Sequence, residues 1–170
     1  KGSGILPYPE KVSALLEEMR QLPEIRFSVK MRLGWQDADE WRQVLPLLNR
    51  SCVVQVTLHP RIGKQQYKGE VNRTAFQVFY EACELPLVYN GDLRTLEAVQ
   101  ELMEAYPRLK GVMLGRGLLA DPSLARSIRE GKAPDKATLY RQVAEMHRLM
   151  YEYYSRTIEG GEAQLLAKLK

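Results

Sequence analysis

Two short glycine-containing segments in the middle of the chain could bind an anion. Asn90–Asp92 follows the apolar run PLVY, and Gly115–Gly117 follows the run LKGVML. Glycine lets backbone N–H groups approach an anion closely, and the arginine between the two glycines of the second segment adds a charge-assisted donor. Each segment alone is also an ordinary turn or loop. We interpret the pair as a phosphate-binding site, which a helix beginning after Gly117 would strengthen.

Lys30 and His59 stand at comparable positions, at the ends of two earlier apolar runs. A lysine at a strand end can donate to a phosphate or to an electron-rich ring, although exposed lysines are usually only solvated. His59 is either a hydrogen-bonded core histidine or a donor to a ligand. No second histidine lies near it in the sequence, so we expect no metal site.

A basic loop is expected directly after His59. The segment RIGKQQYK places Arg61, Lys64 and Lys68 around Tyr67. Such a loop could contact the phosphate backbone of RNA, on the same face as the anion site. A basic loop also serves solubility alone, and that alternative stays open.

Alternating segments predict the elements that position these residues. Strand-like runs occupy residues 25–34, 52–59, 86–90 and 109–115, and helical patterns occupy residues 9–22, 37–50, 73–83 and 95–105. Asp37 or Asp39 is the expected N-cap of the second helix. The alternation predicts an α/β fold with a parallel sheet, and the carboxyl ends of parallel strands gather ligand-binding residues at one edge.

About four strands are too few to close an eight-stranded barrel. The sheet is therefore either open or part of a (β/α)8 barrel. Beyond residue 115 only helices are expected, at residues 123–130 and 136–157, with a further helical start at residues 162–170.

The composition is that of a globular protein with one main core. The chain has 170 residues, of which 45% are hydrophobic and 27% charged. No apolar run approaches the roughly 20 residues that span a bilayer, so we expect no membrane association and a cytoplasmic location. A net charge of +4 permits a polyanionic partner without requiring one. Cys52 and Cys83 are expected to be buried small hydrophobes.

The ordered segments SVKMRLGW, VTLHPRIGKQQYKG, VYNGDL and VMLGRGLLADP resemble the tRNA-dihydrouridine synthases, flavin enzymes with a barrel and a C-terminal helical domain. The resemblance covers residues 1 to about 130, and the later helices agree only in kind. It implies the C-terminal half of a (β/α)8 TIM barrel over residues 1–131, followed by the start of a helical tRNA-binding domain over residues 132–170.

The resemblance also implies a cofactor, a reductant and a partner. FMN would be bound by a set of strand-end residues and NADPH would reduce it, while tRNA would be the substrate. The implied FMN-binding residues are Lys30, His59, Asn90, Gly91, Asp92, Gly115 and Arg116. The implied substrate and RNA contacts are Arg61, Lys64, Tyr67 and Lys68.

One departure from the family pattern concerns the proton donor. The family supplies it from a cysteine in an Asn-x-Gly-Cys-Pro-like context, and this sequence contains no such motif. Neither Cys52 nor Cys83 is placed to replace it. We therefore expect the chain alone to be inactive, and we expect self-association of the truncated barrel as one way to cover its strand edges. Two alternatives remain: a non-catalytic RNA-binding fragment, and part of another FMN-dependent barrel oxidoreductase.

Overall fold

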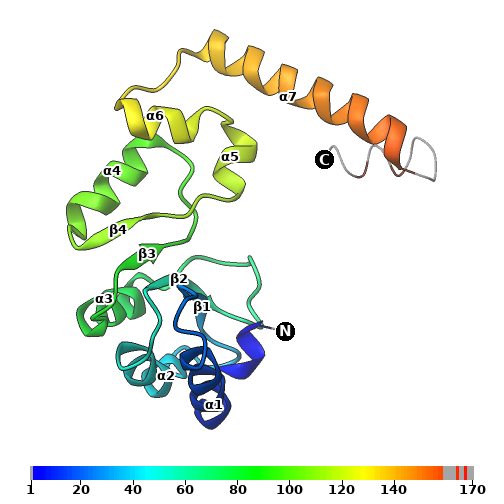
Figure 1. Cartoon of the computed structure of the whole chain (residues 1–170). Helices are drawn as coiled ribbons and strands as arrows, with labels where there is room; N and C mark the ends of the chain where they lie inside the picture. The colour runs from blue at the N-terminus through cyan, green and yellow to red at the C-terminus, as the bar shows by residue number, and fades with distance from the viewer. Residues whose placement is uncertain (1, 159–163, 165–166, 168–170) are drawn as a thin grey trace. The chain divides into compact units, whose positions relative to one another are not determined.

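The computed structural model describes residues 2–158, 164 and 167, and it divides into two compact units (Figure 1). Unit 1 comprises Lys1–Asp92 and Leu102–Met113, and unit 2 comprises Leu93–Glu101 and Leu114–Lys170. The whole sheet lies in unit 1, whereas the C-terminal helices lie in unit 2. The functional domain boundary between residues 131 and 132 stays a prediction.

Four parallel strands form one sheet among the described residues of unit 1. They are β1 (Ser28–Gly34), β2 (Gln55–Ile62), β3 (Leu87–Tyr89) and β4 (Leu109–Val112), hydrogen-bonded in the order β1-β2-β3-β4. A helix precedes β1, and one helix follows each of β1, β2 and β3: α1 (Pro9–Arg20), α2 (Trp41–Asn49), α3 (Arg73–Ala82) and α4 (Leu96–Ala105). The predicted α/β fold is confirmed, and the arrangement is consistent with a partial TIM barrel.

Local signals in the sequence determine where several helices begin. α1 begins at Pro9, whose fixed φ and missing N–H suit the first turn of a helix. Asn72 caps α3 by accepting a 2.8 Å hydrogen bond from the backbone N–H of Ala75, and Asp135 caps α7 in the same way through the N–H of Thr138, also at 2.8 Å. The remaining helices are η1 (Gly2–Ile5) in unit 1, and α5 (Arg116–Ala120), α6 (Leu124–Glu130) and α7 (Lys136–Thr157) in unit 2.

The two faces of the sheet differ in polarity. α1, α2 and α3 gather on one side of β1 and β2 (Figure 1), and the strand residues of the apolar face are completely buried: Leu33, Val56, Leu58 and Tyr89. Because side chains alternate along a strand, the intervening residues share the opposite face. On β1 and β2 that face carries mainly polar side chains: Lys30, Arg32, Thr57, His59 and Arg61.

β2 continues further than the sequence indicated. The predicted strand ended at His59, but β2 extends to Ile62, which pairs with Gly34 of β1. Pro60 does not turn the chain because it lies where the register between β1 and β2 shifts, a position at which a missing ladder N–H is tolerated. At the other edge β4 is shorter than predicted and ends at Val112.

The predicted N-cap of α2 is wrong. Neither Asp37 nor Asp39 occupies that position, because α2 is preceded directly by Glu40. The Glu40 carboxylate instead accepts hydrogen bonds of 2.6–3.2 Å from the backbone N–H groups of residues 35–37. One carboxylate thus organises the loop between β1 and α2.

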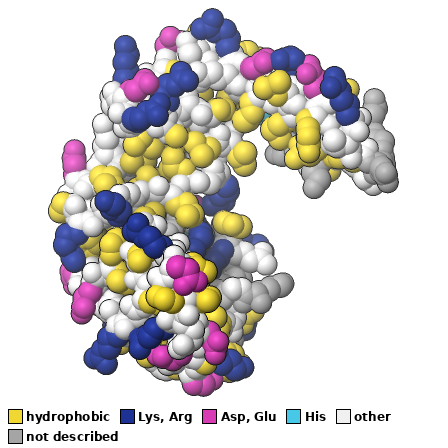
Figure 2. All heavy atoms as spheres, viewed as in Figure 1, with side chains coloured by type: hydrophobic (Ala, Val, Ile, Leu, Met, Phe, Trp, Pro, Cys, Tyr) yellow, Lys and Arg dark blue, Asp and Glu magenta, His cyan; other side chains and the backbone are white. Residues whose placement is uncertain are grey.

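α7 has no buried residue along its described length. Its exposed large hydrophobic side chains are Tyr140, Leu149, Tyr151 and Tyr153. Figure 2 shows hydrophobic side chains on the surface of this helix. The predicted helical start at residues 162–170 lies outside the described residues apart from positions 164 and 167. Within the described part of the chain, no helix is long and apolar enough to cross a membrane.

Candidate active site at the strand ends

Arg61 lies at the centre of a buried polar cluster at the end of β2. Its side chain is 1% exposed, and both terminal nitrogens donate to the Asp92 carboxylate, with an Nη1–Oδ1 distance of 3.2 Å. Nη1 also lies 3.0 Å from Nε2 of His59, and Nη2 donates to the carbonyl of Gly69 at 2.6 Å. Arg61 was predicted in the basic loop after His59. That position is wrong, because β2 extends to Ile62 and strand alternation turns the Arg61 side chain to the same face as His59, against Asp92.

His59 is buried and electrically neutral at physiological pH. Burial, reinforced by the positive charges of Arg32, Lys30 and Arg61, lowers its pKa from 6.5 to about 4, against a smaller opposing effect of Asp92. A guanidinium can only donate, so Nε2 of His59 accepts from Arg61. The proton of the neutral ring is then on Nδ1, which makes Nδ1–H a donor.

Arg32 is a site residue that the sequence analysis missed. It pairs in register with His59 across β1 and β2, and its Nη1 donates to the carbonyls of Ile62 at 2.8 Å and Gln66 at 2.7 Å. Its guanidinium lies 5.5 Å from the ring centroid of Tyr67. The run SVKMRLG contained a signal for this residue, because the alternation of side chains along a strand puts Lys30 and Arg32 on the same face.

Lys30 lies on the same face, two residues before Arg32 and opposite Thr57. It sits within β1 rather than at its end, and its side chain is exposed. Desolvation by the surrounding protein atoms and the neighbouring positive charge of Arg32 lower the pKa of Lys30 from its ordinary value. Lys30, Arg32 and His59 therefore form a cationic and donor-rich patch across two adjacent strands.

The loop that follows β2 brings Tyr67 to this patch. The Tyr67 ring centroid lies 6.0 Å from that of His59, while the tyrosine itself is 61% exposed. Lys64 and Lys68 are both exposed, and Lys64 Nζ donates to the Gln36 side chain at 2.6 Å. The basic loop predicted from the sequence is thus present from residue 63 onward.

Asn90, Gly91 and Asp92 follow β3 directly, as predicted. The Asn90 side chain donates to the carbonyl of Met113 at 2.8 Å, which ties the ends of β3 and β4 together. A Cβ at Gly91 would come 2.9 Å from Val71, so packing of the protein itself requires glycine there. Asp92 has a positive φ of 43°, which directs the chain away from the strand while its carboxylate meets Arg61.

Gly115 and Arg116 belong to unit 2, where they begin α5. Gly115 is the N-cap residue, and a Cβ there would meet no atom within 4 Å. Gly117 has no room for a side chain, because a Cβ at that position would come 2.3 Å from the carbonyl oxygen of Leu93. The structure brings Lys30, His59, Arg61 and Asn90–Asp92 together in unit 1, and it assigns Gly115 and Arg116 to the following unit.

Comparison with known proteins decides the family. A family model described as "Dihydrouridine synthase (Dus)" matches residues 1–166. The chain belongs to the Dus family. The resemblance inferred from the strand-end motifs is thereby confirmed.

Several curated Dus relatives align over most of this chain. A "Probable tRNA-dihydrouridine synthase" of Rhizobium leguminosarum bv. phaseoli is 27% identical over 158 residues, covering 92% of this chain and 50% of the relative. A "tRNA-dihydrouridine(16) synthase" of Haemophilus ducreyi is 27% identical over 155 residues, covering 89% of this chain and 46% of the relative. A "tRNA-dihydrouridine(20a/20b) synthase [NAD(P)+]" of Schizosaccharomyces pombe is 29% identical over 131 residues, covering 76% of this chain and 40% of the relative. The chain spans about half the length of the curated relatives it matches.

Proposed function

We propose that this chain is the C-terminal part of a flavin-dependent tRNA-dihydrouridine synthase, which reduces uridine in tRNA to 5,6-dihydrouridine with FMN and NADPH. Family membership over residues 1–166 supports the reaction class. The sequence has no Asn-x-Gly-Cys-Pro motif, and Cys83 is buried at the end of α3. The chain alone would therefore bind ligands without completing the reaction.

The observation that carries this proposal is the patch formed by Lys30, Arg32 and His59. It combines two cations with a neutral histidine whose Nδ1–H is a donor, and electron-rich heteroatoms of a flavin ring accept from such groups. The Asp92 carboxylate would repel a phosphate, but Arg61 neutralises it. The residues present in unit 1 therefore fit an anionic, acceptor-rich cofactor.

We assign the remaining FMN contacts to the loops after β3 and β4. Asn90 and Gly91 would border the cofactor, Asp92 would accept from its ribityl hydroxyls, and Gly115 and Arg116 would hold its phosphate. The open space beside Gly115 suits the approach of a phosphate to the backbone. When bound, FMN supplies the hydride that reduces the uracil ring.

The RNA-facing residues would be Lys64, Tyr67 and Lys68, joined by the helical segment over residues 132–170. Tyr67 is exposed and lies beside His59, so it could stack on a base that has left the helical stack. Arg61 has a different role in our proposal. It positions His59 and Asp92 through its hydrogen bonds instead of touching RNA, because its side chain is buried.

Titrations with FMN and with tRNA test this proposal and separate it from the alternatives. We expect saturable quenching of FMN fluorescence by the wild-type chain, and a tRNA mobility shift that the Lys64→Ala/Lys68→Ala double variant weakens without changing FMN affinity. A tRNA shift without any FMN binding would favour a non-catalytic RNA-binding fragment. FMN binding without tRNA binding would favour another flavin-dependent barrel oxidoreductase.

A further inference from the structure

The loop over residues 63–70 follows β2, carries Tyr67 and has an unusual backbone on both sides of that residue. Gln66 has a φ of 54°, and Gly69 has a φ of 62°. Glycine adopts this left-handed conformation readily. A glutamine in it costs free energy, and such a conformation persists only where the surrounding contacts fix the backbone. The loop must therefore be held by other groups of the protein.

Two arginines of the strand face hold the loop from the side of the sheet. Arg32 Nη1 donates to the carbonyl of Gln66 at 2.7 Å, and Arg61 Nη2 donates to the carbonyl of Gly69 at 2.6 Å. These are the carbonyls of the two residues with a positive φ. The loop is thus tied to the sheet once before and once after Tyr67.

Gln65 holds the same loop from within. Its side-chain Nε2 donates to the carbonyl of Lys68 at 2.7 Å and to the carbonyl of Glu70 at 2.9 Å. A side-chain amide nitrogen has two hydrogens, so both donors of Gln65 are used. Both carbonyls belong to residues that follow Tyr67, whose ring centroid lies 6.0 Å from that of His59. The amide of Gln65 therefore closes the segment that leads away from the tyrosine.

We propose that Gln65 is a positioning residue for Tyr67, whose ring its two hydrogen bonds keep beside His59, in place to stack on an unpaired base. Without these bonds the arginines still tether the loop, but the segment after Tyr67 is released and the ring leaves His59. A ring that is already in place loses less conformational entropy when a ligand binds. The stacking role of Tyr67 rests on the proposed function, whereas its placement by Gln65 does not.

The ring signals of His59 in a ¹H–¹³C NMR spectrum test this placement without any ligand. A neighbouring aromatic ring shifts such signals, and Tyr67→Leu removes that ring. The chain has two histidines, and His147→Gln assigns their signals. We expect Gln65→Ala to move the His59 signals most of the way from their wild-type positions to those of Tyr67→Leu. Unchanged His59 signals in Gln65→Ala would overturn the proposal.

Gln65→Glu separates the hydrogen bonds from the size of the side chain. Glutamate has the same length, but its carboxylate cannot donate and would face the carbonyl oxygens of Lys68 and Glu70. The His59 signals of this variant should move at least as far as those of Gln65→Ala. Wild-type signals in Gln65→Glu would show that the two hydrogen bonds do not place the ring, and the proposal would fail.

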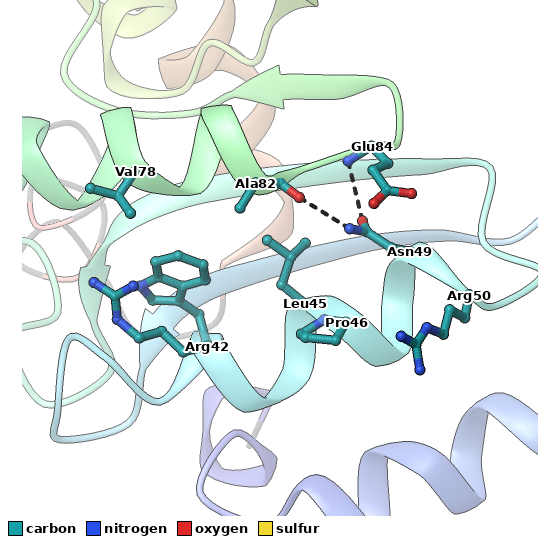
Figure 3. Close-up of a pocket in the computed structure, with 9 residues that line it drawn as sticks. Arg42, Leu45, Pro46, Asn49, Arg50, Val78, Ala82 and Glu84 are labelled. Atoms are coloured by element: carbon teal, nitrogen blue, oxygen red, sulfur yellow. Dashed lines mark hydrogen bonds between the residues drawn. The ribbon is translucent and has the colours of Figure 1, made fainter.

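Asn49→Ala is the matched control for a general loss of stability. Asn49 is another side-chain amide that bridges backbone groups of unit 1. It donates to the carbonyl of Ala82 at 3.1 Å and accepts from the N–H of Glu84 at 3.3 Å, as the dashed lines of Figure 3 show. Asn49→Ala should leave the His59 signals in place. The same signal shift in Asn49→Ala as in Gln65→Ala would refute a specific effect of Gln65.

A double-mutant cycle on tRNA affinity tests whether the placement matters for binding. Gln65→Ala changes no charge, and it should weaken tRNA binding about fivefold in the wild-type background, because stacking on the Tyr67 ring is impaired. In a Tyr67→Ala background the same change should cost less than about twofold. Equal losses in the two backgrounds would overturn the proposal. If the wild-type chain bound no tRNA, the proposed function would fail, while the His59 signals would still decide the role of Gln65.

Discussion

At the residue scale, the ion pair of Arg61 and Asp92 joins a buried cation to a partly exposed anion, with side-chain exposures of 1% and 32%. Removing one partner of such a pair leaves the other charge uncompensated, which costs more than the pair itself contributes. Arg61 additionally contacts His59 and the carbonyl of Gly69. The geometry of the candidate site therefore depends on this one guanidinium.

Asp92→Asn should destabilise the chain by about 2 kcal/mol, somewhat below the range for a fully buried pair because Asp92 is partly exposed. Urea unfolding monitored by circular dichroism measures the effect. Asp39→Asn is the matched control, because its ion pair with Arg42 is exposed on both sides and should contribute less than about 1 kcal/mol. Equal losses for the two variants would contradict the structural role given to Arg61.

His59 makes stability depend on pH in a defined direction. Its pKa of about 4 in the folded chain is below the ordinary 6.5, mainly because of burial. The unfolded state therefore binds more protons at His59 between these values. Its contribution to stability is fully present above about pH 6.5 and is lost as the pH falls through about 4.

Urea unfolding of wild type and His59→Gln at about pH 7, about pH 5.5 and about pH 4.5 tests this assignment. We expect the free energy of unfolding to fall more steeply with decreasing pH in wild type than in the variant. Parallel decreases would mean that His59 is not the neutral, buried group described above.

At the element scale, the sequence predicted the type and order of every strand and of α1, α2, α3, α4, α6 and α7, because hydrophobic periodicity reports directly on which face is buried. It failed where tertiary contacts overrode local signals. The predicted strand ended at His59, before Pro60, yet β2 continues through Pro60 because the register shift between β1 and β2 accommodates it. Glu40 replaced the two predicted aspartates because its longer side chain reaches back to three backbone N–H groups.

The same limits apply to the site. Lys30, His59 and Asn90–Asp92 were found because polar residues at the ends of apolar runs stand out in a sequence. Arg32 was missed and Arg61 was misplaced, since both depend on which face of a strand a residue occupies and on which distant carboxylate it meets. Side-chain pairing over 31 positions in the chain, as between residues 61 and 92, leaves no local pattern.

Helix caps give a prediction at this scale. Asn72→Ala should lower the free energy of unfolding by about 1 kcal/mol, because α3 buries Phe76 and Phe79 and its cap is coupled to the core. Asp135→Ala should instead leave the main unfolding transition nearly unchanged and reduce helical signal, because α7 buries no described residue. Urea unfolding and far-ultraviolet circular dichroism measure both effects. A larger loss of unfolding free energy in Asp135→Ala than in Asn72→Ala would contradict the description of α7.

At the scale of the whole molecule, the sheet of unit 1 has two outer strands, β1 and β4, each hydrogen-bonded to one neighbour. Unpaired strand edges tend to pair with another chain. Sedimentation velocity over a range of protein concentrations should therefore show self-association that increases with concentration. A single monomeric species at all concentrations would contradict this expectation.

We propose that the strand-end residues bind both the phosphate tail and the ring of FMN. Fluorescence titration of FMN against riboflavin, which lacks the phosphate, tests it most directly. We expect wild type to bind FMN at least about tenfold more tightly than riboflavin, Arg116→Ala to remove most of this difference, and Lys30→Ala to weaken the binding of both ligands. Equal affinity for the two flavins, or no saturable binding of FMN, would contradict it.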